Sequence, residues 1–401
     1  MSNRFQMPST EPVDLTGRTI LQVVPQLETG GAEVTTFEMA EAIVKAGGRA
    51  VVVSEGGALA ANIIEAGGEI IHLPVASKNP FTMRRNSRHL AQLMRDENID
   101  LIHGRSRAPC WSSLFAAKRA NIPFVTTFHS TVHAQPRAKV FYNSSLMRGQ
   151  CVIANSHFTA ARIQSVYPSM VEKLRVIPRG CDETALARDN FSAANIAAKR
   201  KQWGVAENAF VIMCPARVTH LKGQHVLIDA LGLLKNGAAK SKQAPTLVLV
   251  GSAQGRDEYV AQLRQSAAQL GMSERLVMTG LETDMPSAYA AADLAIVPTI
   301  RPEPFGRTCI EAQAASLPVI ASDDGGFRET VIAETAQNGG TGWLAAPDNA
   351  VALAAAIDAA LAMSPEDLAH LGKNGRANVL ENYTRRAMCN RTLNVYREWL
   401  L

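Results

Sequence analysis

The chain has 401 residues, of which 47% are apolar and 19% charged, with a formal net charge of +5. This length favours two domains of about 200 residues each, and the composition is that of a globular protein and excludes a disordered one. No apolar run reaches the roughly 18 residues of a membrane-spanning helix. Six cysteines stand singly, without a C-x-x-C pair, at positions 110, 151, 181, 214, 309 and 389. Such spacing is typical of reduced cytoplasmic thiols and argues against a zinc site or a disulfide framework.

The first half of the chain alternates short apolar runs with helical patterns. Residues 1–18 carry charge and proline without the apolar core of a signal peptide, so we expect a loose tail there. The spacing of apolar residues over 33–48 predicts a helix that ends at Gly47-Gly48. The apolar runs have the length of parallel strands buried on both faces. They cover 19–27, 50–56, 69–75, 99–106, 122–130, 151–156 and 174–180.

Residues 182–208 break this rhythm and are interpreted as a linker followed by a helix. The apolar runs then resume at 210–218, 246–252, 275–280, 293–299, 318–322 and 342–347. Two successive β/α series predict an α/β protein with two doubly wound, Rossmann-like domains that face each other across a cleft. We place them at 1–190 and 191–382, followed by an amphipathic C-terminal helix at 383–401. Ligands are expected outside the carboxyl ends of the strands.

The segment RPEPFGRTCIEAQAASLPVIASDDGG, which begins at residue 301, places two glutamates around a predicted helix start. Glu303 precedes this start, which lies near Gly306 or Arg307, and Glu311 lies about one turn inside the helix. A helix N-terminus presents free N–H groups and the positive end of its dipole, which suits phosphate or sugar hydroxyls. From the spacing alone, Glu303 could equally cap the helix and Glu311 could be an exposed helical residue.

The same segment resembles the E-x7-E signature of the family 4 glycosyltransferases, written EPFG-x4-EA followed by G-x-PVIAS-x-x-GG. Ser316 departs from it, at a position where glycine is common. The resemblance spans about residues 18–385 and implies the GT-B fold. It also implies retaining transfer of a hexose from a UDP- or GDP-sugar to a glycan or lipid-linked acceptor, as in lipopolysaccharide or other cell-surface glycan synthesis. Glu311 would then hold the ribose and Glu303 the donor sugar.

In the family, backbone N–H groups around the same corner bind sugar and phosphate, which here implies Phe305, Gly306, Arg307 and Thr308. The stretch PARVTHLKGQ resembles the family's GR-x4-KG element, with Ala216 in place of its glycine. Its cations, Arg217 and Lys222, would clamp the diphosphate and stabilise its departure. Neither cofactor nor metal ion is implied, because the co-substrate is the nucleotide sugar.

Four positions of the first half also match the family. Gly30 and Gly31, in LETGGAE, resemble the GGAE loop beside the donor phosphates. His129, at the end of a predicted strand, corresponds to the family's catalytic histidine, which contacts the transferred sugar, and Ser156 matches the VIAxS turn on the acceptor side. A lone histidine or a tight turn is by itself more often structural. Where the family has IPNG, this chain has VIPRG, so no role carries over to Arg179.

Basic residues are concentrated between positions 101 and 180, where 11 Lys and Arg accompany one acidic residue, Glu172. This excess indicates either a solvated face or a surface for an anionic partner, and we expect peripheral contact with an anionic membrane. Nucleic acid is not expected, because no nucleic-acid-binding motif accompanies the charge. Alternatives are a nucleotide-sugar 2-epimerase of the same fold and a non-catalytic sugar-binding protein. A nicotinamide dehydrogenase would need the G-x-G-x-x-G fingerprint that the GGAE loop lacks.

Overall fold

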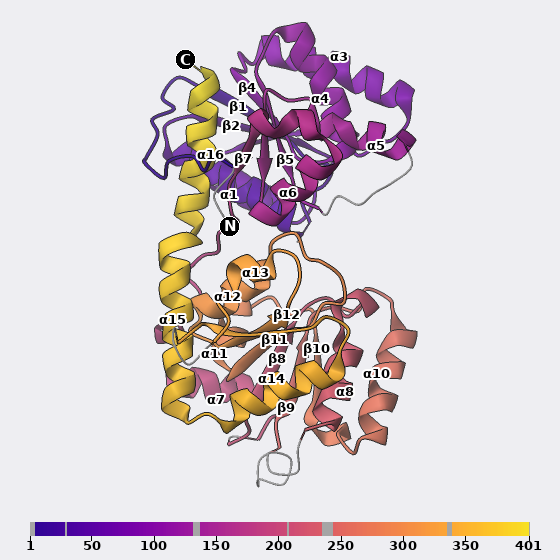
Figure 1. Ribbon diagram of the computed structural model, residues 1–401. Helices are drawn as coiled ribbons and strands as arrows, with labels where there is room; N and C mark the ends of the chain where they lie inside the picture. Colours follow the sequence, from indigo (N-terminus) through magenta and orange to yellow (C-terminus); the bar gives the residue numbers. More distant parts are fainter. Residues whose placement is uncertain are drawn as a thin grey trace. The chain divides into compact units, whose positions relative to one another are not determined.

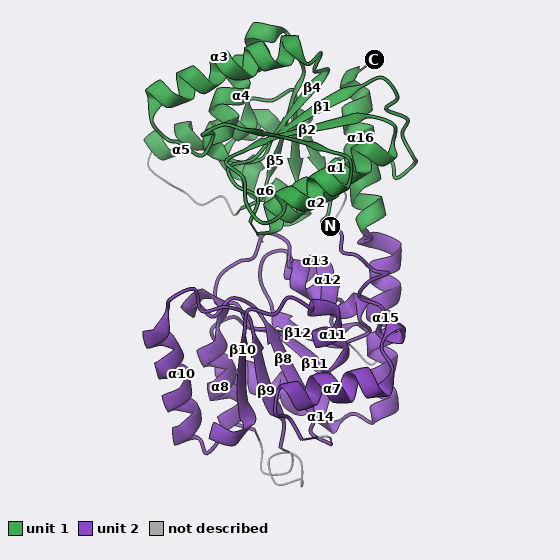
Figure 2. Cartoon of the chain, turned by 180° about the vertical axis from the view of Figure 1, so that it is seen from behind, with its two compact units in different colours: residues 1–179, 385–401 green, residues 180–384 purple. Residues whose placement is uncertain are grey.

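The computed structural model describes residues 5–28, 30–130, 137–206, 208–234, 244–334 and 339–400. It divides into two compact units, residues 5–179 with 385–400 (unit 1) and residues 180–384 (unit 2) (Figure 2). The division therefore falls earlier in the chain than the predicted 190/191. The predicted C-terminal helix belongs to unit 1, so this unit is assembled from both ends of the described chain (Figure 1).

Unit 1 is built on a parallel seven-stranded sheet in the order β3-β2-β1-β4-β5-β6-β7. Side chains of β1 alternate between its two faces, since Leu21 and Val23 pack into one core and Ile20 into the other. This alternation explains the uninterrupted apolar runs, because both faces are covered by helices. The strands are β1 (Thr19–Val23), β2 (Arg49–Ser54), β3 (Glu69–His72), β4 (Leu101–Gly104), β5 (Phe124–Phe128), β6 (Cys151–Ala154) and β7 (Leu174–Val176).

The helices of unit 1 form two layers. One face of the sheet packs against α3 (Pro80–Asp96), α4 (Arg107–Ala120) and α6 (His157–Val166), and α5 (Arg137–Asn143) lies beyond α4 (Figure 1). The other face packs against α1 (Gly31–Lys45), α2 (Ala60–Glu65) and α16 (Arg385–Leu400). The last helix is held by a buried polar contact, in which the Tyr396 hydroxyl lies 2.6 Å from Nδ1 of His103 on β4.

The prediction of a loose tail at residues 1–18 is wrong for the described part of that segment. Phe5, Val13 and Leu15 are buried, and the amide of Val176 donates to the carbonyl of Gln6 at 3.0 Å. The tail lacks a long apolar run, but these scattered apolar side chains are enough to fix it on the two cores of unit 1.

Unit 2 contains a parallel six-stranded sheet in the order β10-β9-β8-β11-β12-β13. Its strands are β8 (Val211–Pro215), β9 (Thr246–Val250), β10 (Leu276–Gly280), β11 (Leu294–Val297), β12 (Val319–Ser322) and β13 (Gly342–Ala345). Its helices are α7 (Ala193–Gln202), α8 (Gln224–Gly232), α10 (Asp257–Gln269), α11 (Met285–Ala290), α12 (Arg307–Ala314), α13 (Phe327–Thr330), α14 (Ala350–Ala362) and α15 (Pro365–Asn382). Each predicted strand and the two doubly wound domains are confirmed.

Two further properties concern the whole described chain. None of its helices is long and apolar enough to span a bilayer. All six cysteines are unbridged and buried. Burial raises the pKa of the thiols of Cys110, Cys151, Cys214, Cys309 and Cys389, that of Cys110 to about 12. Such thiols are poor nucleophiles at neutral pH.

Candidate active site

The loops that follow β8 and β11 meet at the carboxyl edge of the unit 2 sheet, because these two strands are paired neighbours. Lys222 ends a short 3-10 helix, η4 (His220–Lys222), and its Nζ lies 2.8 Å from Oε2 of Glu303. Both side chains remain partly exposed, at 23% and 33%. The backbone adds a second link, as the amide of Ile300 donates to the carbonyl of Leu221 at 3.1 Å. An ammonium and a carboxylate are thus fixed together at the edge where ligands of such sheets bind.

The corner before α12 leaves the helix N-terminus without a side-chain cap. Its N-cap, Gly306, has a left-handed backbone with φ of +96°, which glycine adopts without strain. Glu303 therefore does not cap the helix. Its carbonyl instead accepts from the amide of Gly326 at 2.8 Å. A Cβ on Gly325 would lie only 2.4 Å from the Glu303 carbonyl oxygen, so the predicted glycine pair allows two loops to pack backbone to backbone.

Glu311 lies one turn inside α12 and is held by two neighbours. Arg307 Nε donates to its Oε1 at 2.9 Å, and the hydroxyl of Tyr289 donates to its Oε2 at 3.1 Å. Glu311 is partly exposed, with 22% of its side chain accessible, so it is not the fully solvated glutamate of the alternative interpretation. Tyr289 is fully buried, and burial together with Glu311 raises its pKa well above the usual value. It is therefore a permanent donor to this carboxylate.

The other predicted residues of unit 2 differ in exposure. Arg217 follows β8 and is exposed, and none of the ion pairs recorded among the described residues involves it. It lines a hollow of about 840 Å³ with Thr219, His220 and Tyr259. Phe305 is buried and packs edge to face on Tyr383. Thr308 lies in the first turn of α12, so its predicted contribution is the amide and not the side chain.

The predicted residues of unit 1 lie at the carboxyl edge of its own sheet. Gly30 is the N-cap of α1, whose first residue is Gly31, and both glycines are exposed without a side-chain cap. Ser156 is buried at the N-cap of α6, where its hydroxyl oxygen accepts from the amide of Thr159 at 2.9 Å. We therefore assign Ser156 a helix-capping role.

His129 follows β5, and its Nδ1 is hydrogen-bonded by the guanidinium Nη2 of Arg179. A guanidinium can only donate, so this contact requires the neutral tautomer with the proton on Nε2. That Nε2 atom is buried and has no hydrogen-bond partner among the described residues. The residue that departs from the family's asparagine thus prepares His129 as a hydrogen-bond donor.

Two residues that position functional side chains, Tyr289 and Arg179, were not predicted from the sequence. Arg179 stands next to Gly180, and its basic character was visible, but its partner lies 50 residues earlier. Tyr289 lies on another helix, 22 residues before Glu311, in an apolar run whose composition indicates only a buried core segment. Within the described residues, no group of three or more His, Cys, Asp or Glu is arranged to hold a metal ion.

Comparison with known proteins identifies the family of the chain. Residues 29–185 match the family model described as Glycosyltransferase Family 4, and residues 195–378 match that of Glycosyl transferases group 1. The crystal structure of a glycosyltransferase from Rickettsia africae is 32% identical, with a TM-score of 0.85 over 96% of this chain and 98% of that one. The chain belongs to glycosyltransferase family 4. Its two parallel-sheet, Rossmann-like domains constitute the GT-B fold expected from the sequence.

Further relatives of this family 4 member carry more specific names. A D-inositol 3-phosphate glycosyltransferase of Jonesia denitrificans is 30% identical, over 58% of this chain and 57% of the relative. The lipopolysaccharide core mannosyltransferase LpsB of Rhizobium meliloti is 31% identical, over 46% and 50%. The chain thus matches about half the length of these curated relatives. The Anabaena protein Alr3699/HepE, crystallised with UDP-glucose, has a TM-score of 0.78 at 24% identity, over 95% and 99%.

Proposed function

We propose that this protein transfers a hexose from a nucleoside-diphosphate sugar to an acceptor hydroxyl, with retention of anomeric configuration. The observation that carries the proposal is the contact between Lys222 and Glu303 beside the uncapped N-terminus of α12. This contact brings together, at one edge of the sheet, an ammonium group that can bind an anion and a carboxylate that can accept hydrogen bonds from sugar hydroxyls. UDP-glucose as a ligand of the Anabaena neighbour is consistent with such a donor.

In this reaction the difficult charge develops on the departing diphosphate. Lys222, Arg217 and the N-terminal end of α12 provide fixed positive potential for it, and preorganised stabilisation of this kind is usually the largest catalytic contribution. Glu303 keeps the Lys222 ammonium in place and accepts hydrogen bonds from hydroxyls of the sugar, while Glu311 accepts those of the ribose. The family resemblance assigns His129 a contact with the transferred hexose. The leaving phosphate takes the proton of the acceptor on the same face of the sugar, and no metal ion is required.

The donor is identified by thermal denaturation with UDP-, GDP- and ADP-sugars. A ligand that binds the folded state at 100 times its Kd stabilises it by about 2.7 kcal/mol, so the correct donor raises Tm and the others do not. NMR spectroscopy of that donor with and without acceptor glycans then reports the product. An α-donor that yields an α-glycoside supports retaining transfer. Isomerisation of the donor without an acceptor would instead identify a 2-epimerase, and the absence of any shift and any product would refute the proposal.

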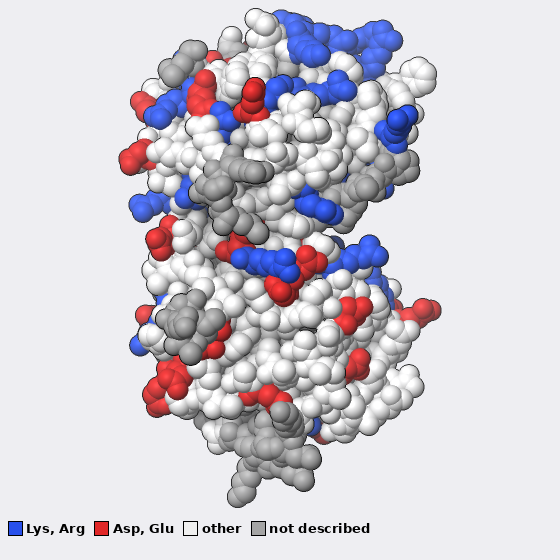
Figure 3. Space-filling view, viewed as in Figure 1, with Lys and Arg blue, Asp and Glu red and all other residues white. Residues whose placement is uncertain are grey.

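We further propose that the acceptor is lipid-linked, on the evidence of the basic surface of unit 1. Lys and Arg gather at the top of this unit, over the region where Figure 1 draws α3 (Figure 3). In the basic segment 101–180, the Arg148 guanidinium lies 5.3 Å from the ring centre of Trp111 and 5.4 Å from that of Phe141, which is 62% exposed. Basic residues mixed with exposed rings suit an anionic bilayer surface, at about 1 kcal/mol for each well-placed cation. The LpsB relative acts in lipopolysaccharide core synthesis, which is consistent with such an acceptor.

Co-sedimentation with vesicles tests this surface. Binding to anionic vesicles at low salt is expected, with loss at high salt, on neutral lipid, and in a variant with Glu at Arg137, Lys139 and Arg148. A control variant with Glu at three exposed basic residues of unit 2, Lys201, Arg256 and Arg264, should sediment like the unmodified protein. Equal sedimentation of both variants contradicts docking through Arg137, Lys139 and Arg148. No sedimentation of the unmodified protein at low salt contradicts membrane docking and leaves a soluble acceptor.

A further inference from the structure

Unit 2 has a second hollow, on the edge of its sheet opposite to Lys222 and Glu303. It has a volume of about 740 Å³ and is lined by Phe210, Asp293 and Pro318, which directly precede β8, β11 and β12. These three strands are parallel neighbours, so their amino ends lie together and their carboxyl ends form the edge described above. Strands of four or five residues separate the two edges by about 15 Å. The hollow is therefore distinct from the proposed donor site.

Four basic side chains line this hollow, against two acidic ones. They come from three elements: Arg188 from the 3-10 helix η3 (Arg188–Asn190), Arg200 from α7, and Lys373 and Arg376 from α15. The acidic residues are Asp189 and Asp293. The lining therefore carries two positive charges in excess, although unit 2 contributes little to the basic character of the sequence.

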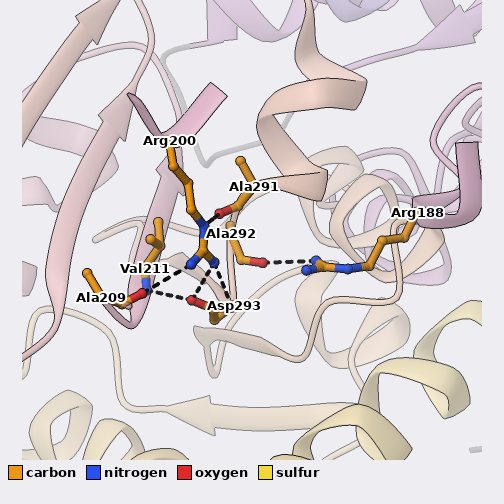
Figure 4. Close-up of polar contacts among 7 residues, drawn as sticks. All are labelled: Arg188, Arg200, Ala209, Val211, Ala291, Ala292 and Asp293. Atoms are coloured by element: carbon orange, nitrogen blue, oxygen red, sulfur yellow. Dashed lines mark hydrogen bonds and ion pairs between the residues drawn. The ribbon is translucent and has the colours of Figure 1, made fainter. Parts of the chain in front are cut away.

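Asp293 neutralises only one of these cations. Arg200 donates from Nη2 to both of its carboxylate oxygens at 2.9 Å, and the amide of Val211 adds a third bond at 2.8 Å (Figure 4). Arg188 approaches the same turn from the other side and donates to the carbonyl of Ala292 at 3.0 Å (Figure 4). Arg200 and Asp293 thus form a structural pair that fixes the strand ends, and both Asp293 oxygens already accept hydrogen bonds.

The other three cations have no carboxylate within ion-pair distance among the described residues. Arg188 is half-buried, and burial lowers the pKa of its guanidinium. Of the two nearby charges, Asp293 raises this pKa and Arg200 lowers it further. Arg376 donates to the carbonyls of Glu183 and Ala314, and Lys373 is exposed at the rim. Removing a guanidinium from water without a counter-charge is unfavourable, so proteins normally pair such a group. An anionic ligand would supply the missing counter-charge.

Apolar side chains complete the wall and indicate the rest of the ligand. They include Leu317, Leu361, Met363 and Leu368, from the strand end, the end of α14 and the start of α15. Pockets of 300–1,000 Å³ with mostly apolar walls and a few placed polar groups are typical small-molecule sites. Three cations neutralise a dianion better than a single carboxylate, and guanidinium groups match phosphate oxygens in geometry.

We propose that this hollow binds a small phosphate monoester that carries an apolar group. The phosphate contacts Arg188, Lys373 and Arg376, and the apolar group lies against Leu317 and its neighbours. Such a ligand would contact α15 and the amino ends of three strands whose carboxyl ends carry the proposed donor site. This placement makes it a candidate effector of unit 2.

Isothermal titration of the full chain tests the proposal with three probes: phenyl phosphate, benzoate and phenol. Phenyl phosphate should bind most tightly, because it combines the dianion with an aromatic ring. The variant Arg188→Gln/Lys373→Gln should weaken its binding at least about tenfold, as expected for lost charge-assisted hydrogen bonds. A matched variant at the other edge, Arg217→Gln/Lys222→Gln, should retain the binding. If the double variant does not fold, the single variant Lys373→Glu replaces it, because it changes only an exposed side chain; it should also weaken the binding of phenyl phosphate.

Four results would overturn the inference. The first is binding of phenyl phosphate that persists unchanged in Arg188→Gln/Lys373→Gln or in Lys373→Glu. The second is binding that disappears in Arg217→Gln/Lys222→Gln, which would assign the phosphate to the donor edge. The third is benzoate binding as tight as that of phenyl phosphate. The fourth is the absence of heat from phenyl phosphate at millimolar concentration. None of these measurements depends on glycosyl transfer, so failure here leaves the proposed function intact.

Discussion

Replacing Glu311 by glutamine separates the two proposed glutamate roles. Its carboxylate accepts from Arg307 and from the hydroxyl of Tyr289, one bond on each oxygen. A carboxylate has about four acceptor positions, so two remain for the hydroxyls of a ribose. Glutamine keeps a single acceptor oxygen and adds two donors. It cannot satisfy Arg307, Tyr289 and the ribose together.

The magnitude follows from the loss of hydrogen bonds to a charged acceptor. Such bonds contribute about 1.5–3 kcal/mol, so Glu311→Gln should weaken nucleotide binding roughly 10- to 150-fold. The free nucleoside diphosphate and the nucleotide sugar should be affected equally, because both contain the ribose. Glu303→Gln should leave the affinity for the free diphosphate within about threefold and weaken only the sugar-bearing donor.

Isothermal titration calorimetry with both ligands measures these differences. Tyr289→Phe is the matched control, since it removes one donor to Glu311 and keeps the carboxylate; we expect nucleotide affinity within about threefold of the unmodified protein. Thermal melts establish that each variant is folded. Unchanged diphosphate affinity in folded Glu311→Gln would refute the ribose assignment. Equal losses for both ligands in Glu303→Gln would refute the sugar assignment.

Three other predictions follow from the same residues. Lys222→Ala and Arg217→Ala should each lower turnover by about 100-fold or more without unfolding the protein; near-normal turnover in either removes that residue from the mechanism. Arg179→Asn should lower kcat about tenfold with little change in donor KM, because His129 loses the donor that fixes its tautomer; a change confined to KM would contradict this. Burial lowers the pKa of His103 well below 6.5, so the unfolded state binds its proton first and stability falls as pH drops below about 6.5. The loss approaches 1.4 kcal/mol per pH unit, and urea unfolding of His103→Gln should show a shallower pH dependence between 7.5 and 5.5; parallel curves would exclude His103 as the cause.

Much of the fold was predictable because it is encoded locally. Buried parallel strands require apolar side chains on both faces. Runs such as 246–252 can therefore be recognised as strands without knowledge of the strands they pair with. The helix start at Gly306 was also predictable, because a glycine corner before a helical pattern has few other conformations. The glycine that is usual at the position of Ser316 also has a local explanation. The φ of Ser316, +58°, is the left-handed conformation that favours the glycine usual at this position.

The sequence by itself therefore determined the two β/α series, the carboxyl edges at which the site residues lie, and the family. Only the tertiary structure decided which side chains meet. Lys222 and Glu303 form an ion pair although they are 81 residues apart in the sequence, and Arg200 and Asp293 pair at a separation of 93 residues. The helix at 385–400 joins unit 1 through a buried contact of Tyr396 with His103. Strands and helices follow from the periodicity of neighbouring residues, whereas an ion pair or a buried polar contact depends on strand order and loop packing, which no local pattern records.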